Sequence, residues 1–202
     1  MSAVATVLIV EDEPLVARGV MRMLPPGIGG QLAGSVAQAI DVLRSGTRMD
    51  GLAIDVYLPD GSGLDVLETS IERHPTTPVL VMTAHSDNRV IANRACSKNA
   101  RFLAKPFGAV DIQPFALDVF AAHWAIPRTV VERFMAFSGT HRLSPRQIDF
   151  FAKHVAHVPR TIVAEQLGIS MNTLKTRTRQ LCRKLGVDGL DVAYERMLRE
   201  AV

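Results

Sequence analysis

The segment that decides the fold of the first half of the chain reads Leu52-Ala53-Ile54-Asp55-Val56-Tyr57-Leu58-Pro59-Asp60-Gly61-Ser62-Gly63. Its apolar start predicts a short buried strand that ends in a carboxylate, Asp55. Four further apolar runs of this kind lie at residues 6–10, 31–34, 79–82 and 102–104. Amphipathic, helix-like stretches lie at residues 14–24, 37–44, 63–73, 87–98 and 109–121. Because parallel strands need crossover helices, this alternation predicts an α/β domain with a five-stranded, doubly wound parallel sheet.

Composition limits the class of protein. The chain has 202 residues, of which 48% are hydrophobic and 5% aromatic, so we expect packed cores that are mostly aliphatic. The apolar run at residues 3–10 is too short to span a bilayer and follows no basic leader, so we expect a cytoplasmic protein without a membrane partner. Cys96 and Cys182 have no CxxC partner, and we expect both to be buried free thiols, which argues against a structural zinc site.

Charge is distributed unevenly along the chain. Residues 1–122 hold 10 Lys and Arg against 13 Asp and Glu, a net charge of −3. Residues 123–202 hold 13 Lys and Arg against 7 Asp and Glu, a net charge of +6. The acidic half suggests cation or phosphate chemistry, and the basic half suggests a polyanion as its partner.

The periodicity changes after the first half. We interpret residues 1–122 as one domain, residues 123–141 as a linker that is part helical, and residues 142–202 as an all-α domain. The sequence Ser144-Pro145-Arg146-Gln147 fits a capping box with Pro at the first helical position. Four helices are expected, over residues 144–157, 160–167, 170–185 and 190–199. A short helix, a turn at Gly168 and a second helix capped by Ser170 form the signature of a helix-turn-helix.

Polar residues follow the predicted strands. The carboxyl ends of parallel strands meet at one edge of a sheet, where functional groups collect. The strands end in Glu11-Asp12, Asp55, Thr83-Ala84 and Lys105-Pro106. Clustered carboxylates repel one another unless a cation lies among them, and Mg²⁺ prefers a few carboxylates together with water and phosphate oxygens. With Mg²⁺ as cofactor, one carboxylate stays ionised and attacks phosphorus, while the ion and Lys105 neutralise the phosphoryl oxygens.

These strand ends and the segment 55–63 resemble a CheY-like receiver domain, which is flavodoxin-like in fold, over residues 4–121. The resemblance implies that Asp55 is the phosphoacceptor and that Mg²⁺ is held by Glu11, Asp12, Asp55 and the backbone carbonyl of Tyr57. It further implies that the peptide bond before Pro106 is cis. The phosphoryl-binding and switch residues that it implies are Thr83, Ala84, Phe102 and Lys105.

Each piece of this pattern also has a simpler interpretation. An acidic pair after a strand is often a solvated helix start, with Asp12 as N-cap and Pro14 in the first turn. Lys105 alone fits a loop, and Thr83 alone fits a strand-end hydroxyl. A receiver that keeps the pocket but is regulated without phosphate is a further alternative. The ring of Tyr57 would slow hydrolysis of a phosphoaspartate, or it is only a half-exposed loop aromatic.

The helix expected over residues 170–185 has two faces. Leu174, Leu181 and Leu185 fall on one side, and a basic stripe falls on the other, which fits the major groove of DNA or a merely solvated face. Residues 142–202 resemble the LuxR-type helix-turn-helix of NarL/FixJ regulators through segments that include 143–146, 169–170, 175–176 and 183–187. The resemblance implies that Lys175, Thr176 and Arg179 read bases and that Arg160, Asn172 and Thr173 contact phosphates. It also implies that Arg183 is a further basic contact to DNA.

Some residues depart from the LuxR-type pattern, and one helix is ambiguous. Gln147, Arg177 and the segment 157–159 put the choice of operator in question. The last helix forms a dimer face in this family or packs on its own domain. Its apolar residues are Leu190, Ala193, Tyr194 and Met197.

The two resemblances together predict a two-component response regulator that controls transcription. It is not a dedicated enzyme, because the receiver catalyses only its own phosphorylation and slow dephosphorylation. Expected partners are a sensor histidine kinase or phosphotransfer protein, double-stranded DNA, RNA polymerase, and a second copy of the chain on DNA or on phosphorylation. An RNA-binding antiterminator would lack the Gly turn and the capped helix. An adaptor that binds a protein would show no steep salt dependence of duplex binding.

Overall fold

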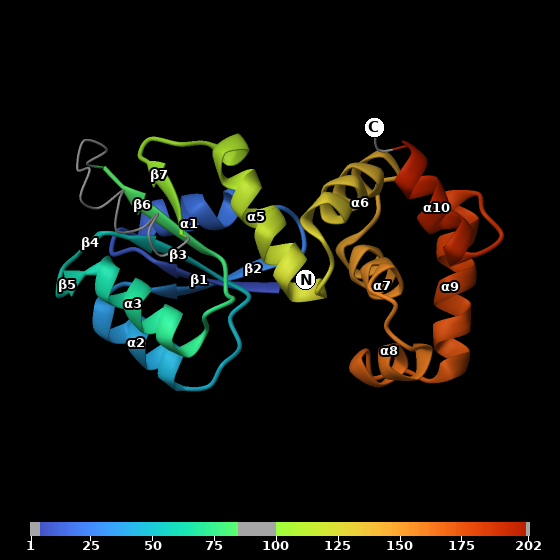
Figure 1. The fold of residues 1–202 in the computed structure, drawn as a ribbon, viewed down its shortest axis with the longest axis horizontal. Helices are drawn as coiled ribbons and strands as arrows, with labels where there is room; N and C mark the ends of the chain where they lie inside the picture. Colours follow the sequence, from blue (N-terminus) through green and yellow to red (C-terminus); the bar gives the residue numbers. More distant parts are fainter. Residues whose placement is uncertain (1–4, 85–99, 201–202) are drawn as a thin grey trace. The chain divides into compact units, whose positions relative to one another are not determined.

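The protein divides into two compact units, one ending at His123 and the other beginning at Trp124. The computed structural model describes residues 5–84 and 100–200 (Figure 1). The helix expected over residues 87–98 and the thiol of Cys96 lie outside these ranges. Within the described residues, none of the helices is long and apolar enough to cross a membrane.

The first unit is built on a parallel sheet. The strands are β1 (Ala5–Val10), β2 (Ile28–Ala33), β3 (Gly51–Asp55), β6 (Val79–Thr83) and β7 (Arg101–Ala104). They lie in the order β2-β1-β3-β6-β7, and every neighbouring pair is parallel. The predicted doubly wound sheet is therefore confirmed. β2 begins earlier than expected, at Ile28, because Gly29 and Gly30 interrupt the apolar pattern. A Cβ on Gly30 would lie 2.9 Å from the ends of the Ile9 and Met21 side chains, so a larger residue there would require these side chains to shift.

Helices cover both faces of this sheet (Figure 1). The helices α2 (Val36–Arg44) and α3 (Gly63–Arg73) lie on one face, and α1 (Pro14–Met23) and α5 (Ala109–Trp124) lie on the other. Alternate strand residues point to opposite faces, so both faces of the central strands are buried. A two-stranded hairpin, β4 (Tyr57–Leu58) and β5 (Gly61–Ser62), follows Asp55 and was not expected from the sequence.

Asp50 ties three elements together just before β3. Its Oδ2 atom accepts a hydrogen bond from the Thr6 N–H at 2.9 Å, and its Oδ1 atom lies 2.8 Å from His123 Nδ1 at the end of α5. Arg48 Nε donates to the same Oδ1 atom at 3.1 Å. Burial works to raise the pKa of Asp50, but the bonds from His123 and the Thr6 N–H, together with the charges of His123 and Arg48, lower it overall.

The second unit consists of five helices that pack around aromatic side chains. They are α6 (Arg128–Thr140), α7 (Pro145–Val155), α8 (Arg160–Gln166), α9 (Met171–Leu185) and α10 (Leu190–Glu200). Trp124 packs edge-on against Phe134 with ring centroids 5.4 Å apart, and Phe134 lies 5.5 Å from Phe151. Most of the buried hydrophobic side chains of this unit are nevertheless aliphatic, as the composition predicts, and five aromatic side chains lie among them.

The helix expected within residues 123–141 is present, and it packs in the core of the second unit. Residues 128–140 form α6, whose side chains Val131, Phe134 and Phe137 are buried in the second unit. The apolar residues recur at a spacing of three, so they line one face of a helix. Of the two interpretations of α10, the structure favours packing on its own domain, because Leu190, Ala193 and Met197 are buried within their own unit, where α10 contacts α6, α7 and α9.

We predict that Phe134→Ala lowers the free energy of unfolding of the second unit by about 3–5 kcal/mol, the usual cost of removing a buried ring. The side chain is fully buried. Urea unfolding followed by the fluorescence of the neighbouring Trp124 measures the change. Thr129→Ala, an exposed position on the same helix, is the control. A loss below roughly 0.5 kcal/mol in Phe134→Ala would instead favour a linker without a core role.

We predict an acid-dependent contribution from Asp50. A carboxyl group with a lowered pKa stabilises the fold above its unfolded pKa, near 3.8, and that stabilisation is lost as the pH falls through the lower folded value. The difference in urea midpoint between wild type and Asp50→Asn should therefore be largest near pH 5 and shrink toward about pH 3. A difference that is constant across this range would contradict the assignment.

Candidate functional site

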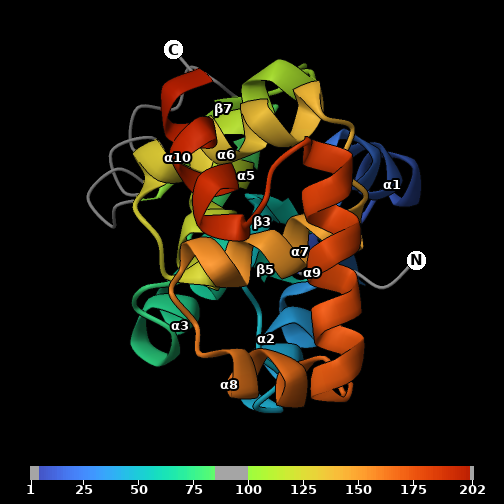
Figure 2. The same ribbon diagram turned by 90° about the vertical axis from the view of Figure 1, so that its right-hand side faces the viewer.

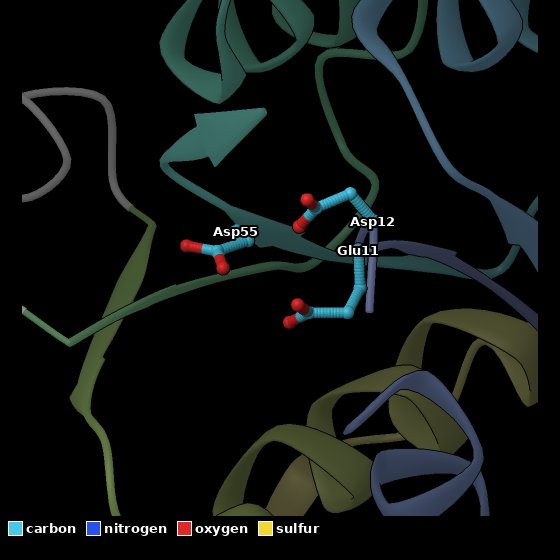
Figure 3. Close-up of side chains that lie close together, drawn as sticks. All are labelled: Glu11, Asp12 and Asp55. Atoms are coloured by element: carbon cyan, nitrogen blue, oxygen red, sulfur yellow. The ribbon is translucent and has the colours of Figure 1, made fainter. Parts of the chain in front are cut away.

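Three carboxylates lie together at the carboxyl edge of the sheet (Figure 3). Glu11 and Asp12 follow β1, and Asp55 is the last residue of β3, which pairs with β1. Each side chain offers an oxygen, and these three oxygens lie within 4.8 Å of one another. Glu11 and Asp55 are 4% and 7% exposed, whereas Asp12 is exposed. The expected convergence of the strand ends is therefore present.

Lys105 contacts two of these carboxylates. Its Nζ atom donates hydrogen bonds to Glu11 Oε2 at 2.6 Å and to Asp55 Oδ2 at 2.7 Å. The residue follows β7, and its N–H donates to the carbonyl of Thr83 at the end of β6, at 2.7 Å. The Lys105–Pro106 peptide bond is cis, as the resemblance to receivers implies. The backbone thus directs an ammonium group into the acidic cluster.

Burial and pairing have opposite effects on these groups. Burial raises the pKa of the Glu11 carboxyl group, against the lowering effect of its bond to Lys105, and the charge of Asp55 adds to the rise. Burial also works to lower the pKa of Lys105, but its bonds to Asp55 and Glu11 raise it overall. Lys105 therefore stays protonated at neutral pH and offsets part of the negative charge of the cluster.

The carboxylate set fits a hard divalent cation. Oxygens around one octahedral Mg²⁺ lie at most about 4 Å apart, so only a small adjustment of the three side chains would place them around one ion. The donor set consists of oxygens alone, which suits Mg²⁺ rather than a thiophilic metal. The pKa of Glu11, raised by burial, shows the electrostatic cost that such a cation would relieve.

The hairpin after Asp55 brings backbone groups to the same place. The Tyr57 N–H donates to Asp55 Oδ1 at 3.3 Å. A Cβ on Gly63, the first residue of α3, would lie 1.9 Å from the carbonyl oxygen of Asp55, so only glycine permits α3 to start there. The side chain of Tyr57 is 48% exposed, which agrees with the interpretation of a half-exposed loop aromatic.

Residues expected to sense the phosphoryl group lie on neighbouring strands. Thr83 is fully buried at the end of β6, and Ala84 is exposed directly after it. Phe102 is half-buried on β7, where it pairs in register with Val81 and packs against the core beneath α2 and α3. Thr83 and Phe102 therefore lie close enough in the sheet for a change at one to affect the other, although this coupling stays a prediction.

The expected basic stripe occupies the exposed face of α9. Ser170 caps this helix by accepting from the Thr173 N–H at 3.2 Å, and Gly186 ends it in the left-handed conformation. Leu174, Leu181 and Leu185 are buried. All of the expected contact residues on this helix are exposed, namely Asn172, Thr173, Lys175, Thr176, Arg179 and Arg183.

The remaining expected contact, Arg160, is exposed at the start of α8, which lies beside the N-terminal half of α9 (Figure 2). The capping box of α7 is present, because Ser144 accepts from the Gln147 N–H while the Gln147 side chain accepts from the Ser144 N–H. Lys184 Nζ donates to Gln147 Oε1 at 3.0 Å, so the end of α9 is attached to the start of α7. Gln147, which departs from the LuxR-type pattern, therefore keeps a structural role.

Sequence reasoning missed Asp60. Its carboxylate, in the turn of the hairpin, accepts hydrogen bonds from two N–H groups of α2 that lie 24 and 23 residues earlier in the chain. A contact at such a separation leaves no local pattern. The only available signal was the Pro59-Asp60-Gly61 turn, which is equally compatible with a solvated side chain.

Comparison with known proteins agrees with this geometry. The family model described as "Response regulator receiver domain" matches residues 7–115. The transcriptional regulatory protein MctR of Rhizobium johnstonii is 25% identical over 186 residues, which cover 90% of this chain and 87% of that protein. The transcriptional activator protein ExaE of Pseudomonas putida is 26% identical over 194 residues, which cover 90% of each chain.

A solved structure extends the likeness in fold over both units. Full-length FixJ from B. japonicum has a TM-score of 0.53 and 20% sequence identity, with 99% of this chain and 98% of that chain covered. At this identity the likeness concerns the fold alone. The family model covers more than half of the chain and spans the acidic cluster and Lys105. The chain belongs to the response regulator receiver family.

Proposed function

We propose that the protein is a response regulator in which phosphorylation of Asp55 in the first unit controls sequence-specific binding of DNA by the second. The observation that carries this proposal is the arrangement in which the Lys105 ammonium donates to both Glu11 and Asp55 while Asp12 lies beside them. In this arrangement the Asp55 carboxylate is the nucleophile, the Lys105 ammonium is the cation beside it, and Asp12 offers a further ligand for a metal cation.

In the proposed reaction, an Asp55 carboxylate oxygen attacks the phosphorus atom of a phosphohistidine or small phosphodonor. The bond from phosphorus to the leaving group breaks as the acyl phosphate forms. Lys105 already bonds to Asp55 Oδ2 and is close enough to pair with an oxygen of the transferred group. Mg²⁺ held by Glu11, Asp12, Asp55 and the Tyr57 carbonyl would supply further neutralisation of charge on the phosphoryl oxygens. Hydrolysis of the acyl phosphate returns Asp55 to its starting state.

The phosphoryl group in this proposal comes from a sensor histidine kinase or a phosphotransfer protein. Relatives of similar length are named as transcriptional regulators, which supports an output at the level of transcription. The exposed basic face of α9 supports DNA as the ligand of the second unit, because Lys175 and Arg179 lie on it within the first two and a half turns of the helix. Contact with RNA polymerase and pairing of two copies on DNA or on phosphorylation belong to the same proposal.

The first prediction of this function concerns Asp55. Wild type incubated with Mg²⁺ and acetyl phosphate should form an acyl phosphate that hydroxylamine cleaves, and Asp55→Ala should form none. Intact-mass spectrometry measures the added group. Asp41→Ala, which removes an exposed carboxylate of α2, is the matched control and should be labelled like wild type. Equal labelling of Asp55→Ala and wild type would exclude Asp55 as the acceptor.

The second prediction concerns the basic stripe. If Arg179 reads a base, Arg179→Ala should cost about 1–3 kcal/mol on the cognate site and relax the sequence preference there. If Arg160 contacts a phosphate, Arg160→Ala should weaken all duplexes alike and lower the salt slope by about one unit. Fluorescence-anisotropy titrations on cognate and scrambled duplexes at several salt concentrations measure both effects.

Arg199→Ala is the control for this experiment, because Arg199 is an exposed arginine on α10 whose side chain pairs with Glu195. It should change binding by less than roughly 0.5 kcal/mol. If Arg179→Ala and Arg160→Ala both bind like wild type with the fold intact, the DNA-reading face is misassigned, and an adaptor that binds a protein becomes the better explanation.

A further inference from the structure

The carboxylate of Asp60 joins the hairpin after Asp55 to a helix on the face of the sheet. Asp60 lies between β4 and β5. Its Oδ1 atom accepts from the Val36 N–H at 2.8 Å, and its Oδ2 atom accepts from the Ala37 N–H at 2.9 Å. Both oxygens of one exposed side chain are therefore used by the first turn of α2.

These two bonds complete the cap of α2. The first N–H groups of a helix have no partner within the helix. Ser35, the N-cap residue, accepts from the Gln38 N–H at 3.2 Å, so Asp60 supplies the partners of the two N–H groups that Ser35 leaves. These backbone bonds, from Ala37 first and then Val36, lower the pKa of Asp60. The side chain is therefore a carboxylate at neutral pH, which the positive end of the helix dipole also favours.

The other end of the hairpin contacts the phosphorylation site. Tyr57 pairs with Ser62 across the hairpin, and its N–H donates to Asp55 Oδ1. Behind it, the Gly63 N–H donates to the Val56 carbonyl at 2.8 Å, which fixes the base of the hairpin. The base is thus held by the backbone around Asp55, and Asp60 holds the turn.

We propose that Asp60 is a positioning residue for the phosphorylation site, because its attachment to α2 sets the orientation of the hairpin and with it the Tyr57 backbone beside Asp55. This inference rests on the proposed function, in which the Tyr57 carbonyl binds Mg²⁺ and Asp55 accepts the phosphoryl group. Asp60 itself touches neither. Its carboxylate acts through a hairpin whose two strands are only two residues long each, and whose base is held at Asp55 and Val56.

Ser35 allows this role to be separated from helix stability. Both Ser35 and Asp60 cap α2, but among the described contacts only Asp60 also belongs to the hairpin. Ser35→Ala should weaken α2 without changing the hairpin. Asp60→Ala should weaken α2 and also release the turn of the hairpin. Asp60→Asn keeps one acceptor and should fall between Asp60→Ala and wild type.

The experiment measures Mg²⁺ binding to the full chain by isothermal titration calorimetry and exchange of the Tyr57 amide by hydrogen–deuterium exchange. Asp60→Ala should weaken Mg²⁺ binding by roughly tenfold, as loss of a residue that orients a ligand usually does. It should also speed Tyr57 exchange. Ser35→Ala should leave both unchanged while lowering the urea midpoint.

The outcomes distinguish this inference from the proposed function. If Asp60→Ala binds Mg²⁺ like wild type, or if Ser35→Ala weakens Mg²⁺ binding as much as Asp60→Ala does, the positioning role is wrong. If wild type binds Mg²⁺ and Asp60→Ala weakens that binding, but acetyl phosphate does not label Asp55, the proposed function is wrong and the role of Asp60 in orienting the hairpin stands.

Discussion

The site depends on the placement of one ammonium group between two carboxylates that are almost buried. Removing a carboxylate from water is costly unless a cation and hydrogen bonds compensate it. At this sheet edge Lys105 provides that compensation for Glu11 and Asp55 at 2.6 and 2.7 Å. The fold of the first unit brings Lys105, Glu11 and Asp55 together. The parallel order of β1, β3 and β7 sends their ends to one edge, and the backbone bond from Lys105 to Thr83 fixes where the lysine side chain begins. The compensation is incomplete, since three carboxylates face one lysine, and this imbalance is what makes the site receptive to a divalent cation.

Much of the first unit could be predicted from the sequence, because its information is local. Five short apolar runs, four of them followed by the polar residues of the site, specify parallel strands with functional groups at one edge, and the acidic cluster follows from that geometry. The resemblance to receivers then gave each residue a role, which physical reasoning alone would have left open. The strand containing Gly29 and Gly30 was placed too late, because glycine carries no apolar side chain and its value there lies in the close approach of Ile9 and Met21.

The structural features that could not be predicted from the sequence share a physical cause. They depend on contacts between residues far apart in the sequence. Residues 123–141 are expected from the sequence to form a part-helical linker, and only the packing of Phe134 against Trp124 and Phe151 shows that this helix has a core role. The sequence likewise leaves two interpretations of α10 open, and its contacts with α6 favour packing on its own domain. Asp60 is the clearest case, since its partners in α2 are 23 and 24 residues away and nothing nearby in the sequence marks them.

The close contact at Gly63 has a consequence for how this sequence can vary. Any other residue there would place a Cβ 1.9 Å from the Asp55 carbonyl oxygen, on backbone that cannot move away without displacing Asp55. This steric restriction on residue 63 does not depend on which signal the protein responds to or which promoter it regulates. A single-nucleotide change in the codon for residue 63 that alters the amino acid would therefore force the backbone around Asp55 to move. The geometry of one helix start thereby restricts that codon to the ones that encode glycine.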